Sequence, residues 1–195
     1  MERDRALARD LRWMLAGIGL ALTLAGVASA QPTANAAPAP APKSVPFEPK
    51  TQVDGPVLQV IFGERALFRL DDGGMPVLDA VEKGKLAIAH PAGTVAETYA
   101  APGPGVLAAA VDGSAETKAT TLKVWNRLNH AVEYGAVVLV LQGGSLHPVP
   151  VPTCPVPAGG VRTETWPAPI VAVGLARFKT ASKAALARCA AKKGK

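Results

Sequence analysis

The segments TTLKVWN (residues 120–126) and VEYGAVVLVL (residues 132–141) decide the fold class of this chain. In the first, apolar residues recur at every second position around Leu122 and Val124, as expected of a half-buried strand. The second is an apolar run that is too short and too rich in β-branched residues to favour a helix. A polar loop, residues 127–130, joins the two, so we expect them to form a hairpin within a β-sandwich.

Short apolar runs of the same kind lie on both sides of this pair. They are bounded by turn segments such as DDGG (residues 71–74), because glycine supplies the positive φ that tight turns require. Together with the pair, these runs predict about eight or nine strands, the further ones at residues 57–62, 66–70, 85–89, 95–99, 106–112, 161–166 and 170–178. Short strands at such regular spacing predict an all-β, immunoglobulin-like β-sandwich domain over residues 57–180.

The C-terminal segment, residues 181–195 (ASKAALARCAAKKGK), has a different character from the sandwich. It is basic and rich in alanine, which favours a helix. Ser182 is a candidate N-cap, and Gly194 lies just past the expected end of the helix. The segment is therefore expected to form a short C-terminal helix or tail.

The chain has two cysteines, Cys154 in a proline-rich loop and Cys189 in the C-terminal segment. In an oxidising compartment such a pair predicts a disulfide, and a bond closing a loop of about 35 residues stabilises a fold by about 3 to 4 kcal/mol. The alternative is two separate thiols, one of them free for intermolecular pairing. A redox-active pair is disfavoured because that chemistry uses the much closer Cys-x-x-Cys spacing.

The first thirty residues have the order of a secretory signal peptide. Basic residues precede an uncharged run (residues 13–27), and the small-x-small sequence Ala28-Ser29-Ala30 follows. We expect cleavage between Ala30 and Gln31, which makes the protein periplasmic or secreted, with no membrane span after cleavage. The alternative is an uncleaved N-terminal membrane anchor, since an apolar stretch of about 18 residues is at the short edge of what spans a bilayer.

Residues 31–56 form a Pro/Ala-rich linker in this prediction, since alternating Ala and Pro favour extended polyproline geometry. After signal cleavage nothing precedes this linker for it to hold at a distance. That mismatch is the best argument for the membrane-anchor alternative.

Histidines and carboxylates give no clear pattern of a metal site or a catalytic site. His90, His130 and His147 fall in three different predicted loops or strand ends. A blue-copper site requires a His soon after its Cys ligand, and no His follows Cys154. The sequence also lacks the closely spaced pairs of ligands that are typical of a zinc site. We therefore predict no metal and no cofactor.

Two loop motifs resemble catalytic or calcium-binding sequences only in part. Residues 143–147 (GGSLH) lack the second glycine of a hydrolase nucleophile loop, and a polar hairpin turn is the better interpretation. Asp71 and Asp72 lack the further carboxylates of a calcium loop. We predict no catalytic residue.

Aromatic residues are scarce, at 5% of the chain, so we expect an aliphatic core. Trp125 and Trp166 are expected to serve core or edge packing. The alternative for Trp166, which precedes Pro167, is to line a ligand groove.

Basic residues gather at the end of a chain whose formal net charge is +6. They could meet an anionic component of the cell envelope by screened attraction, or they could form a solubilising tail. Nucleic acid is not an expected partner because no aromatic residue is interleaved with these charges. The residues are Lys179, Lys183, Arg188, Lys192, Lys193 and Lys195.

These observations lead to the hypothesis of an exported, non-enzymatic β-sandwich of the cell envelope. Its expected role is that of a binding or structural accessory module, with an envelope protein or an anionic envelope component as partner. Two alternatives stay open: a periplasmic metal or small-ligand carrier, and an enzyme whose site is assembled from loops. Fold alone does not decide among them.

Overall fold

The structure is a computed structural model, and it describes residues 49–192. The predicted signal peptide, its cleavage site between Ala30 and Gln31, and most of the predicted linker lie outside the described residues. No helix among the described residues is long and apolar enough to cross a membrane.

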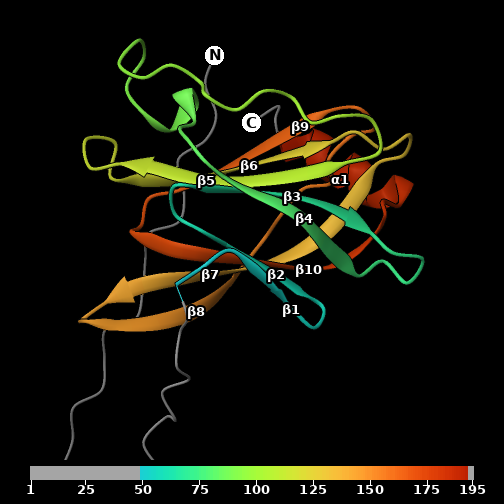
Figure 1. Ribbon diagram of the computed structural model, residues 1–195, viewed down its shortest axis with the longest axis horizontal. Helices are drawn as coiled ribbons and strands as arrows, with labels where there is room; N and C mark the ends of the chain where they lie inside the picture. Colours follow the sequence, from blue (N-terminus) through green and yellow to red (C-terminus); the bar gives the residue numbers. More distant parts are fainter. Residues whose placement is uncertain (1–48, 193–195) are drawn as a thin grey trace, which may run out of the picture. The chain divides into compact units, whose positions relative to one another are not determined.

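Within residues 49–192, ten antiparallel strands form two five-stranded sheets that pack face to face (Figure 1). Sheet A has the order β1-β2-β10-β7-β8, with β1 Gln52–Asp54, β2 Val57–Ile61, β10 Ile170–Thr180, β7 Val132–Gln142 and β8 Ser145–Val151. Sheet B has the order β4-β3-β5-β6-β9, with β4 Pro76–Lys83, β3 Glu64–Leu70, β5 Leu107–Ser114, β6 Ala119–Asn126 and β9 Val161–Trp166. The C-terminal helix α1 spans Lys183–Lys192. The prediction of an all-β sandwich followed by a short C-terminal helix is confirmed.

The segments at residues 120–126 and 132–141 are strands, but they do not pair with each other. Strand β6 pairs with β5 and β9 in sheet B, whereas β7 pairs with β10 and β8 in sheet A. The loop between them therefore carries the chain from one sheet to the other. Asn126, which is fully buried, fixes this crossing by donating from Nδ2 to the carbonyls of His130, Val156 and Pro157. The expected hairpin was wrong because alternation identifies strands without identifying their partners.

Three strands were not predicted from the sequence, and all three lie at the edges of the sheets. Strand β8 contains Pro148 and Pro150, which are tolerated at an edge because proline cannot donate to a further strand. Strand β4 begins at Pro76, and its side chains are mostly exposed. Strand β1 lies inside the predicted linker, so the folded domain extends to residues before Val57.

Two predicted strands, residues 85–89 and 95–99, are not strands. They belong to an excursion between β4 and β5, residues 84–106, whose only regular element is the short 3-10 helix η1, Ala87–Ala89. Leu86, Ala89 and Tyr99 of this excursion are buried against Ala108, Ala110 and Trp125 on the outer face of sheet B. The apolar residues that suggested strands thus form a second, smaller core. In Figure 1 the excursion runs across the outside of β5 and β6.

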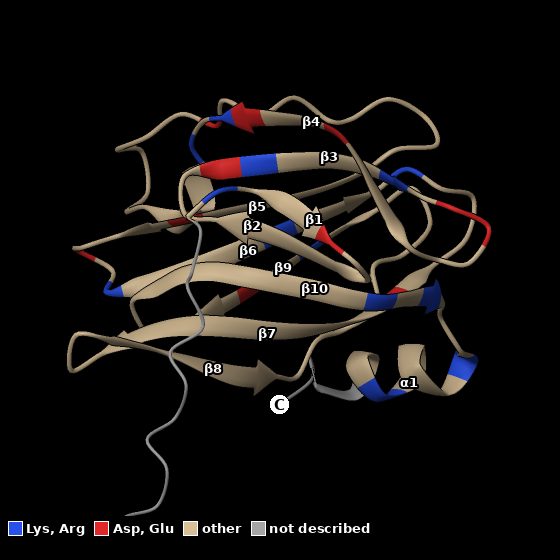
Figure 2. Cartoon of the chain, turned by 60° about the horizontal axis from the view of Figure 1, so that its bottom comes forward, with Lys and Arg blue, Asp and Glu red and all other residues tan. Residues whose placement is uncertain are grey.

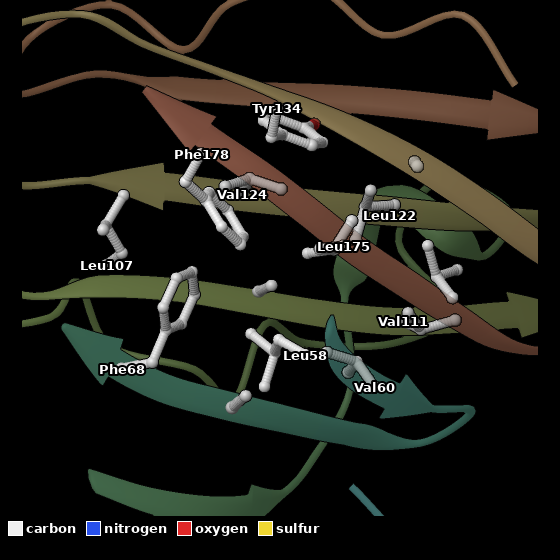
Figure 3. Packing of buried hydrophobic residues seen from close by; sticks show 14 of the residues in the cluster. Leu58, Val60, Phe68, Leu107, Val111, Leu122, Val124, Tyr134, Leu175 and Phe178 are labelled. Atoms are coloured by element: carbon white, nitrogen blue, oxygen red, sulfur yellow. The ribbon is translucent and has the colours of Figure 1, made fainter. Parts of the chain in front are cut away.

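The main core lies between the two sheets and combines aliphatic side chains with a small aromatic group (Figure 3). The rings of Phe68 and Phe178 have centroids 5.4 Å apart, and Tyr134 stacks on Phe178 at 6.0 Å. Leu58 and Leu175, both fully buried, fill the space beside them. Trp125 lies in the smaller core, and Trp166 packs at the edge of the main one, as predicted from the sequence.

Candidate functional site

A disulfide joins Cys154, in the loop after β8, to Cys189 on α1. The two Cα atoms are 5.7 Å apart, and the residues are separated by 35 positions in the sequence. The predicted bond is confirmed. It ties the C-terminal helix to the sandwich at the end of sheet A.

Helix α1 has one face directed at the sandwich. Ser182 caps the helix, since its Oγ accepts a hydrogen bond from the Ala185 N–H at 3.1 Å, which confirms the predicted N-cap. Ala185 is buried, and Cys189 lies one turn further along the same face. Arg188, three residues after Ala185, is carried on this side of the helix toward strands β7 and β10.

Arg177 faces α1 from strand β10, and an irregularity of the strand puts it there. The pairing register of β10 with β7 shifts between Ala176 and Lys179. Without this bulge, alternation would turn Arg177 into the core and Phe178 out of it. With the bulge, Phe178 is buried in the core and Arg177 is exposed on the outer face of sheet A.

The backbone at Arg177 has a φ of 57°, in the left-handed region that side-chain-bearing residues seldom adopt. Such a conformation costs about 1 to 3 kcal/mol and persists where the surroundings enforce it, often at functional sites. Its guanidinium lies directly over Gly135 of β7. A Cβ on Gly135 would come within 2.6 Å of the Arg177 Nη2 atom, so the absence of a side chain there makes the space for the guanidinium.

Four charged side chains line the pocket between α1 and sheet A: Glu133, Arg177, Lys179 and Arg188. Glu133 and Lys179 form an ion pair at 2.9 Å. The hydrogen bond from Lys179 holds the pKa of the Glu133 carboxyl below its usual value, with additional lowering from the Ser182 N–H and the charge of Arg188. Glu133 is therefore a carboxylate that neutralises Lys179, and the charges of the two arginines remain.

Within residues 49–192, the side chains of Arg177 and Arg188 form no hydrogen bond and no ion pair. The pocket between them has a volume of about 320 Å³. A guanidinium carries five N–H donors and pairs well with carboxylate or phosphate oxygens. The arrangement thus offers two positive charges and free donors around a space that fits a compact anion. Figure 2 shows the basic residues of α1 and of the adjoining end of β10 near each other.

The three histidines are not brought together. His90 Nε2 lies 2.9 Å from Oδ2 of the fully buried Asp112, His130 Nδ1 lies 3.0 Å from Oδ1 of Asn129, and His147 is exposed on β8. In the part of the chain that the structure describes, no group of three or more His, Cys, Asp or Glu side chains is placed to hold a metal ion.

The two loop motifs have structural roles. Gly143 and Gly144 make the turn between β7 and β8, with φ values of 58° and 77°, as the hairpin interpretation predicted. Asp71 closes the turn between β3 and β4, because its Oδ1 accepts hydrogen bonds from the N–H groups of Gly73 and Met75. The first turn is built by glycines with positive φ, and the second by a carboxylate that accepts main-chain N–H groups.

A second group of buried charges, which the sequence analysis did not single out, fastens the excursion to sheet B. Asp112 accepts hydrogen bonds from the main-chain N–H of Leu86 and of Gly113, each at 2.8 Å. Arg65 is buried, is paired with Glu82, and lies over the rings of Tyr99 and Trp125. These contacts lie inside the fold. They attach the excursion to sheet B, although the excursion forms no strand that pairs with the sheet.

Sequence reasoning identified Arg188 as part of the basic C-terminal segment and missed Arg177. The one available signal was a charged residue at position 177 in an otherwise apolar run, IVAVGLARF (residues 170–178). The side chains of the predicted basic residues Lys193 and Lys195 lie outside the described residues, as does that of Lys192.

No protein-family model, no curated protein and no solved structure matches this chain.

Proposed function

We propose that this protein is a non-enzymatic binding module of the cell envelope that holds an anionic group between Arg177 and Arg188. The observation that carries the proposal is the pair of guanidiniums, neither of them bonded within residues 49–192, that face one pocket from different elements. One arginine is placed there by a strand bulge and the other by a disulfide-tethered helix.

The pocket differs from a solubilising basic tail in how its charges are arranged. On such a tail, positive charges point into water from unconstrained positions. Here Arg177 has a left-handed backbone conformation, and Arg188 directly precedes Cys189, which the disulfide holds in place. Preorganised donors of this kind lose less conformational freedom on binding, and this favours affinity for one site over nonspecific attraction.

The groups around the pocket support binding rather than catalysis. Its lining includes two hydroxyl side chains: Thr153 donates to the carbonyl of Tyr134 at 2.7 Å, and Tyr134 is buried in the main core. The carboxylate of Glu133 is engaged by Lys179 and by the Ser182 N–H. A nucleophile with an adjacent base, as covalent catalysis requires, is not among the side chains that line this pocket.

The envelope location in this proposal is supported by the signal-peptide pattern of residues 1–30 and by the pair of cysteines. An exported cationic site would meet the phosphate and carboxylate groups of envelope components. An anionic envelope component is therefore the proposed partner, in place of an unspecified envelope protein.

Calorimetric titration with inorganic phosphate at low ionic strength tests the proposal. We expect one saturable site in the wild-type protein. Arg177→Gln and Arg188→Gln should each weaken binding by about 10-fold to 100-fold, since a hydrogen bond to a charged group contributes about 1.5 to 3 kcal/mol.

The matched control is Lys183→Gln, which removes an exposed positive charge from the first turn of the same helix, outside the pocket. Its affinity for phosphate should stay within about twofold of wild type, as expected of a screened charge that makes no contact. Equal losses in all three variants would show general electrostatic attraction and contradict a site between the arginines.

A further inference from the structure

An apolar groove next to the cationic pocket lies on the outer face of sheet A. It has a volume of about 390 Å³ and crosses strands β2, β10 and β7. Its apolar lining comes from Val57, Val137, Leu139 and Ala176, together with Gly174. A Cβ on Gly174 would come within 3.2 Å of Val57 Cγ1, so glycine keeps the groove open at that point.

The groove and the cationic pocket adjoin each other, because Gly135 and Arg177 line both. The guanidinium of Arg177 thus stands at the boundary between an apolar channel and a site for an anion. Arg177 is the only charged side chain among the residues that line the groove. In Figure 2 the middle parts of β2, β10 and β7 carry no charged residues, and charge returns at the end of β10 and in α1.

The outer faces of the two sheets differ in how they are covered. The excursion between β4 and β5 buries Ala108, Ala110 and Trp125 on the outside of sheet B. On sheet A, Val57 and Val137 are exposed by 36% and 38%, and among residues 49–192 no element lies over them. Exposed apolar side chains that gather along a groove make this face a candidate interaction site.

We infer that the anionic ligand is an amphiphile, whose charged head lies between Arg177 and Arg188 and whose single alkyl chain lies in the groove over Gly174. The inference rests on the proposed function and specifies its ligand class. A headgroup alone leaves the apolar groove in water, whereas an alkyl chain attached to it removes that surface from water. The arginine pocket favours a negatively charged group, and the groove beside it favours an alkyl chain. A ligand that carries both therefore fits this surface better than a ligand that carries one of them.

The test compares methyl phosphate with octyl phosphate by calorimetry on the wild-type protein. Octyl phosphate is kept below its critical micelle concentration, as verified by light scattering. We expect octyl phosphate to bind at least about tenfold more tightly, since burial of each methylene contributes up to about fourfold in affinity. The double variant Val137→Thr/Leu139→Gln should lose this advantage while keeping its affinity for methyl phosphate.

The control variant is Val149→Thr, which alters a valine of β8 that is exposed by 42% and does not line the groove. It should behave as wild type toward both compounds. Equal affinity of the wild-type protein for the two phosphates would overturn the amphiphile and leave the anion site in place. Binding of neither compound would overturn the anion site as well.

Two further outcomes would also contradict the inference. Octyl phosphate could bind equally to the wild type and to Arg177→Gln, which would show an apolar contact independent of the headgroup. Vesicles that contain phosphatidylglycerol could bind the protein while monomeric octyl phosphate does not. That result would assign the face to a membrane surface instead of a single ligand molecule.

Discussion

Replacing Asp112 by alanine is expected to lower the free energy of unfolding by about 3 to 5 kcal/mol, the usual cost of removing one partner from a buried charged network. Asp112 is fully buried and accepts hydrogen bonds from Leu86 N–H and Gly113 N–H, with His90 Nε2 at 2.9 Å. Alanine leaves these groups without their acceptor in a site closed to water. Urea unfolding followed by tryptophan fluorescence measures the change, since Trp125 lies in the smaller core.

The matched control is Asp112→Asn, which keeps one oxygen acceptor and nearly the same volume. We expect it to cost less than the alanine variant, because at least one of the two main-chain N–H groups keeps a partner. A loss below about 1 kcal/mol in Asp112→Ala, the net value of an ordinary hydrogen bond, would show that this network does not hold the excursion onto sheet B.

The second large effect is expected from the double variant Cys154→Ser/Cys189→Ser. Opening a loop of about 35 residues should lower the free energy of unfolding by about 3 to 4 kcal/mol on the chain-entropy model. Helix α1 has little else to hold it, because Ala185 is its only buried apolar residue among those described. Chemical denaturation of the variant and of the wild-type protein gives the difference.

The same double variant should also lose phosphate affinity, because Arg188 is adjacent to Cys189 and is held at the pocket through it. Ala190→Ser is the control, since it places a hydroxyl on an exposed position of the same helix and leaves the disulfide intact. Unchanged phosphate binding in a protein that lacks the disulfide would mean that the tether does not build the site.

Most strands of the sandwich could be predicted from local sequence patterns, whereas the pairing of the strands into sheets could not. Alternation in residues 120–126 and the β-branched run in 132–141 identified β6 and β7. The crossing that assigns them to different sheets is stabilised by Asn126, whose three hydrogen bonds reach carbonyls that are as far as 31 residues away. Hydrogen bonds to residues so distant in the sequence cannot be predicted from a local pattern of apolar residues.

Residues 85–89 and 95–99 show a second limit. Their apolar residues predicted strands, yet they cover the outer face of sheet B without pairing. A short apolar run indicates burial, and it does not distinguish a strand from a loop that packs on a sheet. The carboxylate of Asp112, which fastens this loop, comes from a strand that is more than twenty residues away in sequence.

Of the candidate site, the part on α1 could be predicted from the sequence, and the part on β10 could not. The cysteine pair and the basic residues placed α1 and Arg188 correctly. Arg177 was hidden because regular alternation directs that position into the core, and only the bulge between Ala176 and Lys179 turns it outward. The absence of a side chain at Gly135, which gives the guanidinium its space, has meaning only once the two strands are paired.

The site between the arginines is tested most directly by nuclear magnetic resonance of the ¹⁵N-labelled protein titrated with phosphate. The Nε–H signals of Arg177 and Arg188 and the amide signal of Gly135 should shift together and saturate at one concentration. In the disulfide-free variant the two arginine signals should no longer respond in parallel. Small, unsaturated shifts spread over the exposed lysines and arginines, with no preference for Arg177 and Arg188, would contradict the proposed function.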